Sequence, residues 1–300
     1  MKILITGSNG LLGQKLLHRL IEDDNIEVIA TSKGENRLSR SQKYTYLSLD
    51  VTSENEVKKI ISDQSPDIVI NTAAMTNVDL CEEEKESCDR INVDAVSFLA
   101  NSCASINAHL IHISTDFIFD GLDGPYGEDD TPNPISYYGL SKLKSEKILY
   151  NHNVDWTILR TIIVFGVGEN LSKGNIVLWA KGALEKEEKL NIIDDQFRAP
   201  TLAEDLAEAC LLVARKKAHG IFHISGKDIM SIYEMVENIA NYYGYNVNKL
   251  NRISTSTLNQ KAARPPKTGF ILDKAKKILG YKPHSFKEAL SIVDKQLKNS

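Results

Sequence analysis

The stretch TGSNGLLG, residues 6–13, constrains this chain most, because it places glycines at positions 7, 10 and 13 directly after the apolar run KILIT. The segment LLGQKLLHRLIED, with apolar residues at helical spacing, follows at once. A strand, a tight turn and a helix start are predicted, in which Gly7 makes the turn, Gly10 admits a phosphate to the backbone and Gly13 lets helix and strand pack closely. Unpaired N–H groups at the helix start suit a pyrophosphate. The predicted cofactor-binding residues of this loop are Gly7, Asn9, Gly10, Leu11, Leu12 and Gly13.

Short β-branched runs alternate with helical patterns through the first half of the chain. Such alternation predicts right-handed crossovers and a mainly parallel sheet covered by helices on both faces, an α/β doubly wound (Rossmann) fold. The predicted strands cover residues 2–6, 26–31, 44–49, 67–73, 108–115, 154–161 and 220–226. The predicted helices in this half cover residues 54–63 and about 84–104, besides the one after the glycines.

The alternation ends near residue 166, where loops and helical patterns dominate. Helices are predicted over residues 201–216, 231–244 and 285–297. We predict a dinucleotide-binding domain over residues 1–165 and a smaller, mainly helical and mostly substrate-binding lobe over residues 166–300. The strand at about 220–226 is expected to return to the main sheet.

Composition and charge argue against several classes of partner. The net charge is −4, both signs are interspersed, and no long basic run occurs, so neither nucleic acid nor a membrane surface is expected as a partner. No apolar stretch approaches the length of a signal peptide core or a membrane span. Four cysteines without a C-x-x-C pair favour thiols in a reducing cytoplasm. His109 and His112 would point to opposite faces of a strand, so no metal site is predicted.

The segment ATSKGENR, at the end of the second predicted strand, indicates which dinucleotide is bound. An acidic residue here would accept from the ribose 2′-hydroxyl of NAD, but the chain has Ser32, Lys33 and Arg37, which suit a 2′-phosphate. We therefore expect NADP(H) as the preferred cofactor, with NAD(H) as the alternative. At the end of the third strand, Asp50 and Val51 are predicted beside the adenine, with Asp50 accepting from its amino group.

The stretch YYGLSK places Tyr138 four residues before Lys142 in a segment with a helical pattern. Residues at this spacing lie on one face of a helix, about 5–6 Å apart at Cβ. A neighbouring ammonium stabilises a phenolate and lowers the pKa of the phenol, which makes it a better acid. Tyr137 has only Ser141 at the same offset, so Tyr138 is the candidate acid.

Together the glycine loop, NTAA (71–74), ISTDFIFDG (113–121) and the Tyr-x-x-x-Lys pair resemble the extended short-chain dehydrogenase/reductase superfamily. Within it, STDFIFDG, PNPISYYGLSK, DDQFRAPT and ARPPKTGFILDKAKKILG are similar to segments of the dTDP-4-dehydrorhamnose reductases. The likeness covers nearly the whole chain. It implies an oxidoreductase that uses NADPH to reduce the 4-keto group of a nucleotide-linked deoxysugar, with a homodimer as the implied assembly.

The resemblance also implies roles for individual residues. Tyr138 is the expected general acid, Lys142 its charged partner and a ligand of the nicotinamide ribose, and Thr115 the group that polarises the substrate carbonyl. Ser114 is the alternative to Thr115, because the two side chains of a regular strand face opposite ways. Asn92 matches a family position that supports a water or backbone contact near the lysine. Ala73 and Ala74 are expected beside the cofactor.

The expected substrate-binding residues are Asp116, Asn175, Arg198 and Arg264. The two arginines are candidates for the diphosphate, because a guanidinium can bind phosphate in a bidentate manner. Trp179 is a candidate for stacking on a base, although a core position is the stronger expectation. Two residues depart from the family pattern, since Phe117 stands where tyrosine is frequent and Arg198 where glycine is frequent.

Three other functions are open at this point. A sugar dehydratase is disfavoured, because Phe117 cannot shuttle a proton as an acidic residue would. An epimerase would hold NAD tightly and consume no NADPH. A non-catalytic subunit similar to the methionine adenosyltransferase β subunit would keep cofactor binding and serve a partner protein instead.

Overall fold

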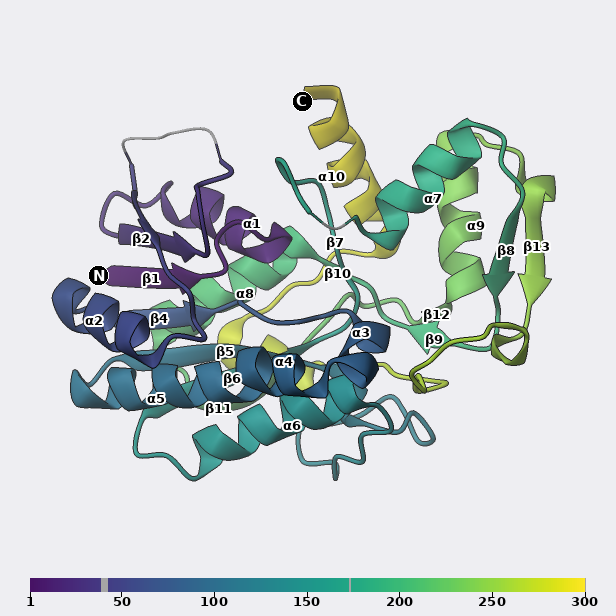
Figure 1. Ribbon diagram of the computed structural model, residues 1–300. Helices are drawn as coiled ribbons and strands as arrows, with labels where there is room; N and C mark the ends of the chain where they lie inside the picture. Colours follow the sequence, from purple (N-terminus) through teal and green to yellow (C-terminus); the bar gives the residue numbers. More distant parts are fainter. Residues whose placement is uncertain (39–42, 173, 300) are drawn as a thin grey trace.

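The computed structural model describes residues 1–38, 43–172 and 174–299, with a seven-stranded parallel sheet at its centre (Figure 1). Every pairing in the sheet is parallel, in the order β11-β6-β5-β4-β1-β2-β3. The strands are β1 (Lys2–Thr6), β2 (Glu27–Ser32), β3 (Thr45–Ser48), β4 (Ile68–Asn71), β5 (His109–Thr115), β6 (Asp155–Thr161) and β11 (Gly220–Ile224). The prediction of a doubly wound parallel sheet is confirmed.

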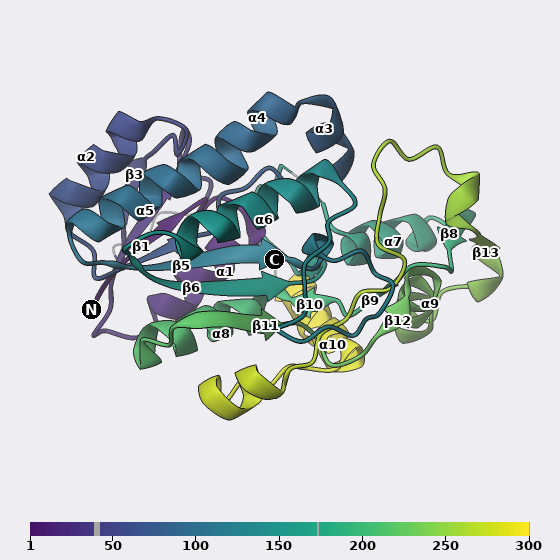
Figure 2. The ribbon, with the colours of Figure 1, turned by 90° about the horizontal axis from the view of Figure 1, so that it is seen from below.

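Helices cover both faces of this sheet, which is why its central strands are apolar along their whole length. All four residues of β4 are buried, and so are the last four of β1. One face carries α2, α5 and α6, and the other carries α1 and α8 (Figure 2). These helices are α1 (Leu11–Leu20), α2 (Glu54–Gln64), α5 (Ala95–Ser105), α6 (Tyr137–Tyr150) and α8 (Ala203–Lys216).

The helix predicted over about 84–104 is interrupted in the structure. It consists of α4 (Lys85–Asp89), a π-helical turn (Arg90–Asp94) and α5, and a short helix α3 (Val78–Glu83) precedes it. A π-helical turn inserts one extra residue and often marks a functional position. Here it contains Asn92, whose buried amide is needed at the site described below.

A second hydrophobic core lies beside the sheet domain and is built mainly from the C-terminal part of the chain. It packs α7 (Ile176–Glu185), α9 (Ile232–Tyr243) and α10 (Phe286–Asn299) with the paired strands β8 (Leu190–Ile193) and β13 (Leu250–Ile253). Shorter strands pair as β7 (Val164–Phe165) with β10 (Thr201–Leu202) and as β9 (Phe197–Arg198) with β12 (Met230–Ser231). A second π-helical turn spans Ala275–Leu279.

Two features of this region differ from the expectations drawn above. Helix α7 and the β8–β13 pair were not predicted, although Asn175 is a helix-capping residue directly before α7; each of the two strands has only four residues, and they pair across a long stretch of sequence. Trp179 on α7 is 51% exposed, so the expectation of a core position is wrong. None of the helices in the described ranges combines the length and hydropathy that a bilayer crossing requires.

A buried ion pair fixes α6 to the sheet. The Arg160 guanidinium on β6 donates through Nε to Glu146 Oε1 at 3.1 Å and through Nη2 to Oε2 at 2.8 Å. Both side chains are almost fully buried. Because α6 carries Tyr138 and Lys142, this pair holds the helix that matters most for the site.

Replacing Arg160 with methionine is expected to lower the free energy of unfolding by about 3–5 kcal/mol, because Glu146 would then be a buried charge without its partner. Lys298→Met serves as the matched control, since it removes the exposed pair with Asp294 and should change stability by less than about 1 kcal/mol. Urea unfolding of both variants measures the difference. Equal stability of the two variants would contradict the assigned importance of the buried pair.

Candidate active site

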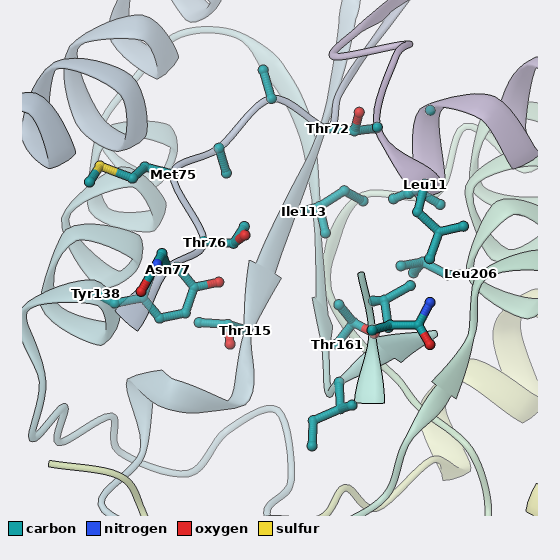
Figure 3. A pocket seen from close by; sticks show the side chains of 18 of the residues that line it. Leu11, Thr72, Met75, Thr76, Asn77, Ile113, Thr115, Tyr138, Thr161 and Leu206 are labelled. Carbon is teal, nitrogen blue, oxygen red and sulfur yellow. The ribbon is translucent and has the colours of Figure 1, made fainter. Parts of the chain in front are cut away.

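A cavity of about 740 Å³ opens at the carboxyl ends of β1, β4 and β5, where parallel α/β sheets bind their ligands. Figure 3 shows Tyr138 and Thr115 side by side on one wall and Leu11 and Leu206 on the opposite wall. Of the residues predicted for the site, those that line the cavity are Asn9, Gly10, Leu11, Leu12, Gly13, Ala73, Ala74, Thr115, Asp116, Tyr138, Lys142 and Asn175. The glycine loop, α6 and the ends of β4 and β5 are thus brought together.

The glycine loop has the geometry that its spacing predicts. Gly7 has a φ of +69°, and a Cβ there would lie 2.9 Å from the amide nitrogen of Ala73. A Cβ on Gly13 would lie 2.4 Å from the carbonyl oxygen of Gly7, so only glycine lets α1 approach the turn this closely. A Cβ on Gly10 would meet only the Gly7 oxygen, at 3.3 Å. Gly13 therefore serves the fold, whereas Gly10 leaves its backbone open toward the cavity.

The N-terminus of α1 suits a phosphate. Its N-cap residue, Gly10, provides no side-chain acceptor, and the first turn holds no acidic residue. By contrast, Ser53, Ser136, Asn175 and Ser231 cap α2, α6, α7 and α9 with side-chain oxygens. The N–H groups and partial positive charge at the start of α1 are thus available to an anion at the cavity wall. The residues present fit the pyrophosphate of a dinucleotide.

The residues predicted for the adenosine end lie at the ends of β2 and β3, outside the cavity lining. Lys33, whose side chain is 79% exposed, pairs with Asp50 at 2.7 Å, and this contact lowers the pKa of Asp50 to about 2. Asp50 also accepts from the hydroxyl of Thr52 at 2.7 Å. Ser32 ends β2, Val51 packs against the core, and Arg37 is exposed, with its backbone N–H donating to Asn9 Oδ1 at 3.0 Å.

Tyr138 and Thr115 form the polar contact at the centre of the cavity wall. The phenol is largely withdrawn from water, which raises the pKa of Tyr138, while a hydrogen bond with Thr115 acts in the opposite direction. Phe117 packs edge-on against the Tyr138 ring, with centroids 5.7 Å apart. Ser114, the alternative to Thr115, has a buried hydroxyl without a hydrogen-bond partner among the described residues.

Lys142 is buried one turn after Tyr138, and its ammonium contacts a residue that was not expected at the site. Its Nζ lies 3.1 Å from Nε2 of His112, and burial lowers the pKa of Lys142 to about 8. The largest effect on the pKa of Tyr138 is burial, which raises it. The pKa of this phenol is therefore raised in this conformation, whereas the Tyr-x-x-x-Lys spacing alone predicted that it is lowered.

Asn92 clamps the loop after β4 onto α6. Its Oδ1 accepts from the N–H of Met75 at 2.8 Å, while its Nδ2 lies 3.0 Å from the Met75 carbonyl oxygen and 3.0 Å from Ser141 Oγ. The asparagine thus holds a cavity-lining backbone segment against the helix of Tyr138 and Lys142.

The residues predicted to bind substrate fall into two groups. Asp116 and Asn175 line the cavity, but both also have structural partners. Asp116 is buried, accepts from the hydroxyls of Thr115 and Thr268, and has its pKa raised by burial. Asn175 caps α7 through Oδ1 and donates from Nδ2 to the Gly166 carbonyl at 2.8 Å.

The two arginines are held by protein groups and do not line the cavity. Arg198 is buried, donates to the carbonyl of Pro265 at 2.6 Å, and lies 3.7 Å from Asp116. Arg264 makes two hydrogen bonds with Asp79, at 2.7 and 3.1 Å. The first contact holds Pro265 against β9, and the second holds Arg264 against α3.

His112 is the residue that the sequence interpretation missed, because it was considered only as a metal ligand. Its ring contacts Asn71, Ser145 and Lys142, whereas His109 contacts Asp155 and Thr157. In the described ranges, no group of three or more His, Cys, Asp or Glu side chains could hold a metal ion. The available signal was position, since His112 precedes Thr115 by three residues and so faces the other side of β5.

The extended short-chain dehydrogenases/reductases combine a parallel sheet, a glycine turn after its first strand and a helix that carries the Tyr-x-x-x-Lys pair. This chain has all three features and is a member of that class. Within that class, the family model described as RmlD substrate binding domain matches residues 1–299. The chain belongs to this family.

Several relatives are similar over nearly the whole chain. The dTDP-4-dehydrorhamnose reductase of Aggregatibacter actinomycetemcomitans is 32% identical over 302 residues, covering 96% of this chain and 97% of the relative. A crystal structure of a dTDP-4-dehydrorhamnose reductase from Clostridium acetobutylicum is 32% identical with a TM-score of 0.87, covering 99% of this chain and 100% of that one. Another, from Bacillus anthracis in complex with NADP, is 26% identical with a TM-score of 0.83, covering 98% and 99%.

A relative of another kind also matches. Methionine adenosyltransferase 2 subunit beta of Bos taurus is 31% identical over 260 residues, which cover 85% of this chain and 76% of the relative. Its similarity to this chain therefore leaves about a quarter of that subunit unmatched.

The glycine loop generates a paired prediction. Gly10→Ala should leave the free energy of unfolding within about 1 kcal/mol of the parent, because the new methyl meets only one protein atom, yet weaken dinucleotide binding about tenfold or more. Gly13→Ala should cost about 1–3 kcal/mol of stability through overpacking. Urea unfolding and a fluorescence titration with NADPH separate the two effects. Unchanged NADPH affinity in Gly10→Ala would place the pyrophosphate elsewhere.

Proposed function

We propose that this protein is an NADPH-dependent reductase acting on the 4-keto group of a nucleotide-linked deoxysugar, converting dTDP-4-dehydrorhamnose to dTDP-rhamnose. The observation that carries the proposal is the position of Tyr138 beside Thr115 on one wall of a cavity whose opposite wall presents the uncapped N-terminus of α1 (Figure 3). An acid and a carbonyl-polarising hydroxyl are thus placed beside a pyrophosphate site. The full-length match to reductases supports the same activity.

The side chains have separate tasks in this reaction. NADPH supplies the hydride when it is bound. Tyr138 donates a proton to the developing oxyanion at C4, and its raised pKa keeps the phenol protonated until the substrate arrives. Thr115 donates a hydrogen bond to the same oxygen, for which its hydroxyl turns away from Asp116 Oδ1, now 3.1 Å distant. Lys142 supplies positive charge near the phenol and hydrogen bonds to the ribose.

We propose further residues for the individual parts of the cofactor and substrate. Asn9, Leu11 and Leu12 border the pyrophosphate, Ala73 and Ala74 the nicotinamide side, and Ser32, Lys33, Arg37, Asp50 and Val51 the adenosine. Asp116 and Asn175 border the sugar nucleotide. Arg264 can reach a diphosphate only by giving up Asp79, and Arg198 only by leaving Pro265, so these two require a conformational change.

A regulatory subunit like methionine adenosyltransferase 2 subunit beta is the second candidate, favoured by the 31% identity to that protein. Coverage favours the reductase, because this chain matches 97% of the reductase and 76% of the subunit. We also propose a cytoplasmic location, on the cysteine pattern, and a homodimer, on the family resemblance. Size-exclusion chromatography with light scattering measures the assembly.

The proposal is tested by incubating the protein with NADPH and dTDP-4-dehydrorhamnose and following absorbance at the NADPH band. The parent should consume NADPH, and Tyr138→Phe should lose about 10²–10⁴-fold in rate while still binding NADPH, because the positioned acid is removed. Tyr137→Phe is the matched control, since that hydroxyl bonds Asp89 at 2.9 Å and lies outside the cavity lining. Inactive parent protein that captures a methionine adenosyltransferase would establish the regulatory alternative instead.

Cofactor choice gives a second prediction. NADPH should bind at least about tenfold more tightly than NADH, because Lys33 and Arg37 can neutralise a 2′-phosphate. Lys33→Met should narrow this ratio, while Lys59→Met, an exposed lysine on α2, should leave it unchanged. Titration of each protein with both dinucleotides measures the ratio. Tighter binding of NADH by the parent would reverse the assignment.

A further inference from the structure

A buried row of polar side chains runs across three strands beneath α6. Thr6 on β1 pairs in register with Asn71 on β4, and Asn71 with His112 on β5, so the three side chains lie on one face of the sheet. All three are at most 2% exposed. The Thr6 hydroxyl donates to Asn71 Oδ1 at 2.6 Å, and Asn71 Nδ2 lies 3.1 Å from His112 Nδ1.

The row ends at Lys142. His112 Nε2 lies 3.1 Å from Lys142 Nζ and 3.0 Å from Ser145 Oγ, and the Ser145 hydroxyl donates to the Lys142 carbonyl at 2.6 Å. The lysine is thus held from both sides, by its own helix and by an imidazole fixed to the sheet. Asn92, which was expected to support a contact near Lys142, instead forms hydrogen bonds with Met75 and Ser141.

The hydrogen-bond directions of the row depend on the charge of Lys142. With Asn71 donating to Nδ1, a neutral His112 carries its proton on Nε2. This N–H can donate to Ser145 Oγ or to an uncharged lysine amine, but it cannot accept from an ammonium. If the Asn71 amide turns over, its oxygen accepts from an Nδ1–H, and the bare Nε2 accepts from the ammonium. The second orientation exchanges the amide oxygen and nitrogen in the same space, and it also requires the Thr6 hydroxyl to turn so that it accepts from the amide instead of donating to it.

We propose that His112 is a positioning residue for Lys142. We also propose that the hydrogen bonds of the row Thr6–Asn71–His112 reverse their direction, and His112 its tautomer, when Lys142 gains or loses its proton. The effect on catalysis rests on the proposed reductase function, whereas the contact between His112 and Lys142 does not depend on it. Burial lowers the pKa of Lys142 to about 8, so both charge forms are within reach near neutral pH. The same burial holds the pKa of His112 well below its ordinary value, so the ring stays neutral and changes only its tautomer.

Other titratable groups lie near Lys142, and their influence on its pKa must be distinguished from that of His112. Glu146 on α6 raises the pKa of Lys142 and is itself bound by Arg160. Cys88 on α4 acts in the same direction, and a hydrogen bond with Cys81 lowers the pKa of Cys88 to about 7. Tyr138 lies one turn away on α6. A Cys88→Ala variant therefore accompanies the measurements below.

Imidazole ¹⁵N spectra recorded between pH 6 and 10 test the contact without any assay. We expect His112 to stay neutral over this range. In the parent and in Cys88→Ala, its tautomer should change with a midpoint equal to the pKa of Lys142. In Lys142→Met, a single tautomer should persist at every pH. His109, on the other side of β5, is the internal control and should not respond to Lys142→Met. Three results would overturn the proposal. The parent could keep one His112 tautomer at every pH, His112 could become protonated to imidazolium in this range, or the tautomer change could persist in Lys142→Met.

Kinetics of His112→Met and His112→Gln test the catalytic consequence. The reaction needs the ammonium, so activity is present below the pKa of Lys142 and is lost as pH rises through it. Without an acceptor for the ammonium this pKa falls, so the basic limb of kcat should move to lower pH in His112→Met, with kcat reduced about 10²-fold and NADPH affinity nearly unchanged. His112→Gln, which keeps an acceptor of similar length, should shift less.

If kcat falls at the same basic pH in the parent, His112→Met and His112→Gln, His112 does not position Lys142. Failure of the proposed function looks different, because the parent itself would then not oxidise NADPH with the keto sugar. In that case the ¹⁵N spectra still decide whether Lys142 and His112 are coupled.

Discussion

The register of the parallel sheet is the constraint on which the rest of the structure depends. Because β1, β4 and β5 are paired without a bulge, Thr6, Asn71 and His112 fall in one row, and the loops after all three strands open at the same edge. A one-residue slip in any pair would turn these side chains to the opposite face and separate them. The cavity and the buried row beneath it therefore follow from one set of backbone hydrogen bonds.

Close packing at two glycines then brings the two halves of the site together. Gly13 lets α1 approach the turn at Gly7, and Gly139 lets α6 approach the backbone of Phe117, where a Cβ would lie 2.1 Å from the carbonyl oxygen. The first contact presents an uncapped helix N-terminus to the cavity, and the second brings Tyr138 against Thr115. The buried pair of Arg160 and Glu146 fixes α6 further along its length. Catalytic geometry here is thus a result of helix-to-sheet packing.

The environment of Lys142 differs from that of a lysine on a helix surface. Spacing alone predicts an ammonium that acts on the nearby phenol, but in the fold this group is buried and lies against a neutral imidazole. Its pKa of about 8 reflects the loss of water, opposed by Glu146 and Cys88. A charge in such a place is sensitive to every hydrogen-bond partner around it, which makes the second layer of residues functionally important.

The sequence by itself determined the strands of the main sheet, the glycine turn and the placement of Tyr138 and Lys142 one turn apart on one helix, because these depend on local periodicity, on residues without a Cβ and on i,i+4 spacing. It also carried the family resemblance that the comparisons confirmed. Only the tertiary structure decided that His112 meets Lys142, that Arg198 and Arg264 are held by protein groups, and that burial raises the pKa of Tyr138. These facts join residues 30 or more positions apart or depend on exclusion of water, and neither long-range contact nor burial is encoded in a local pattern.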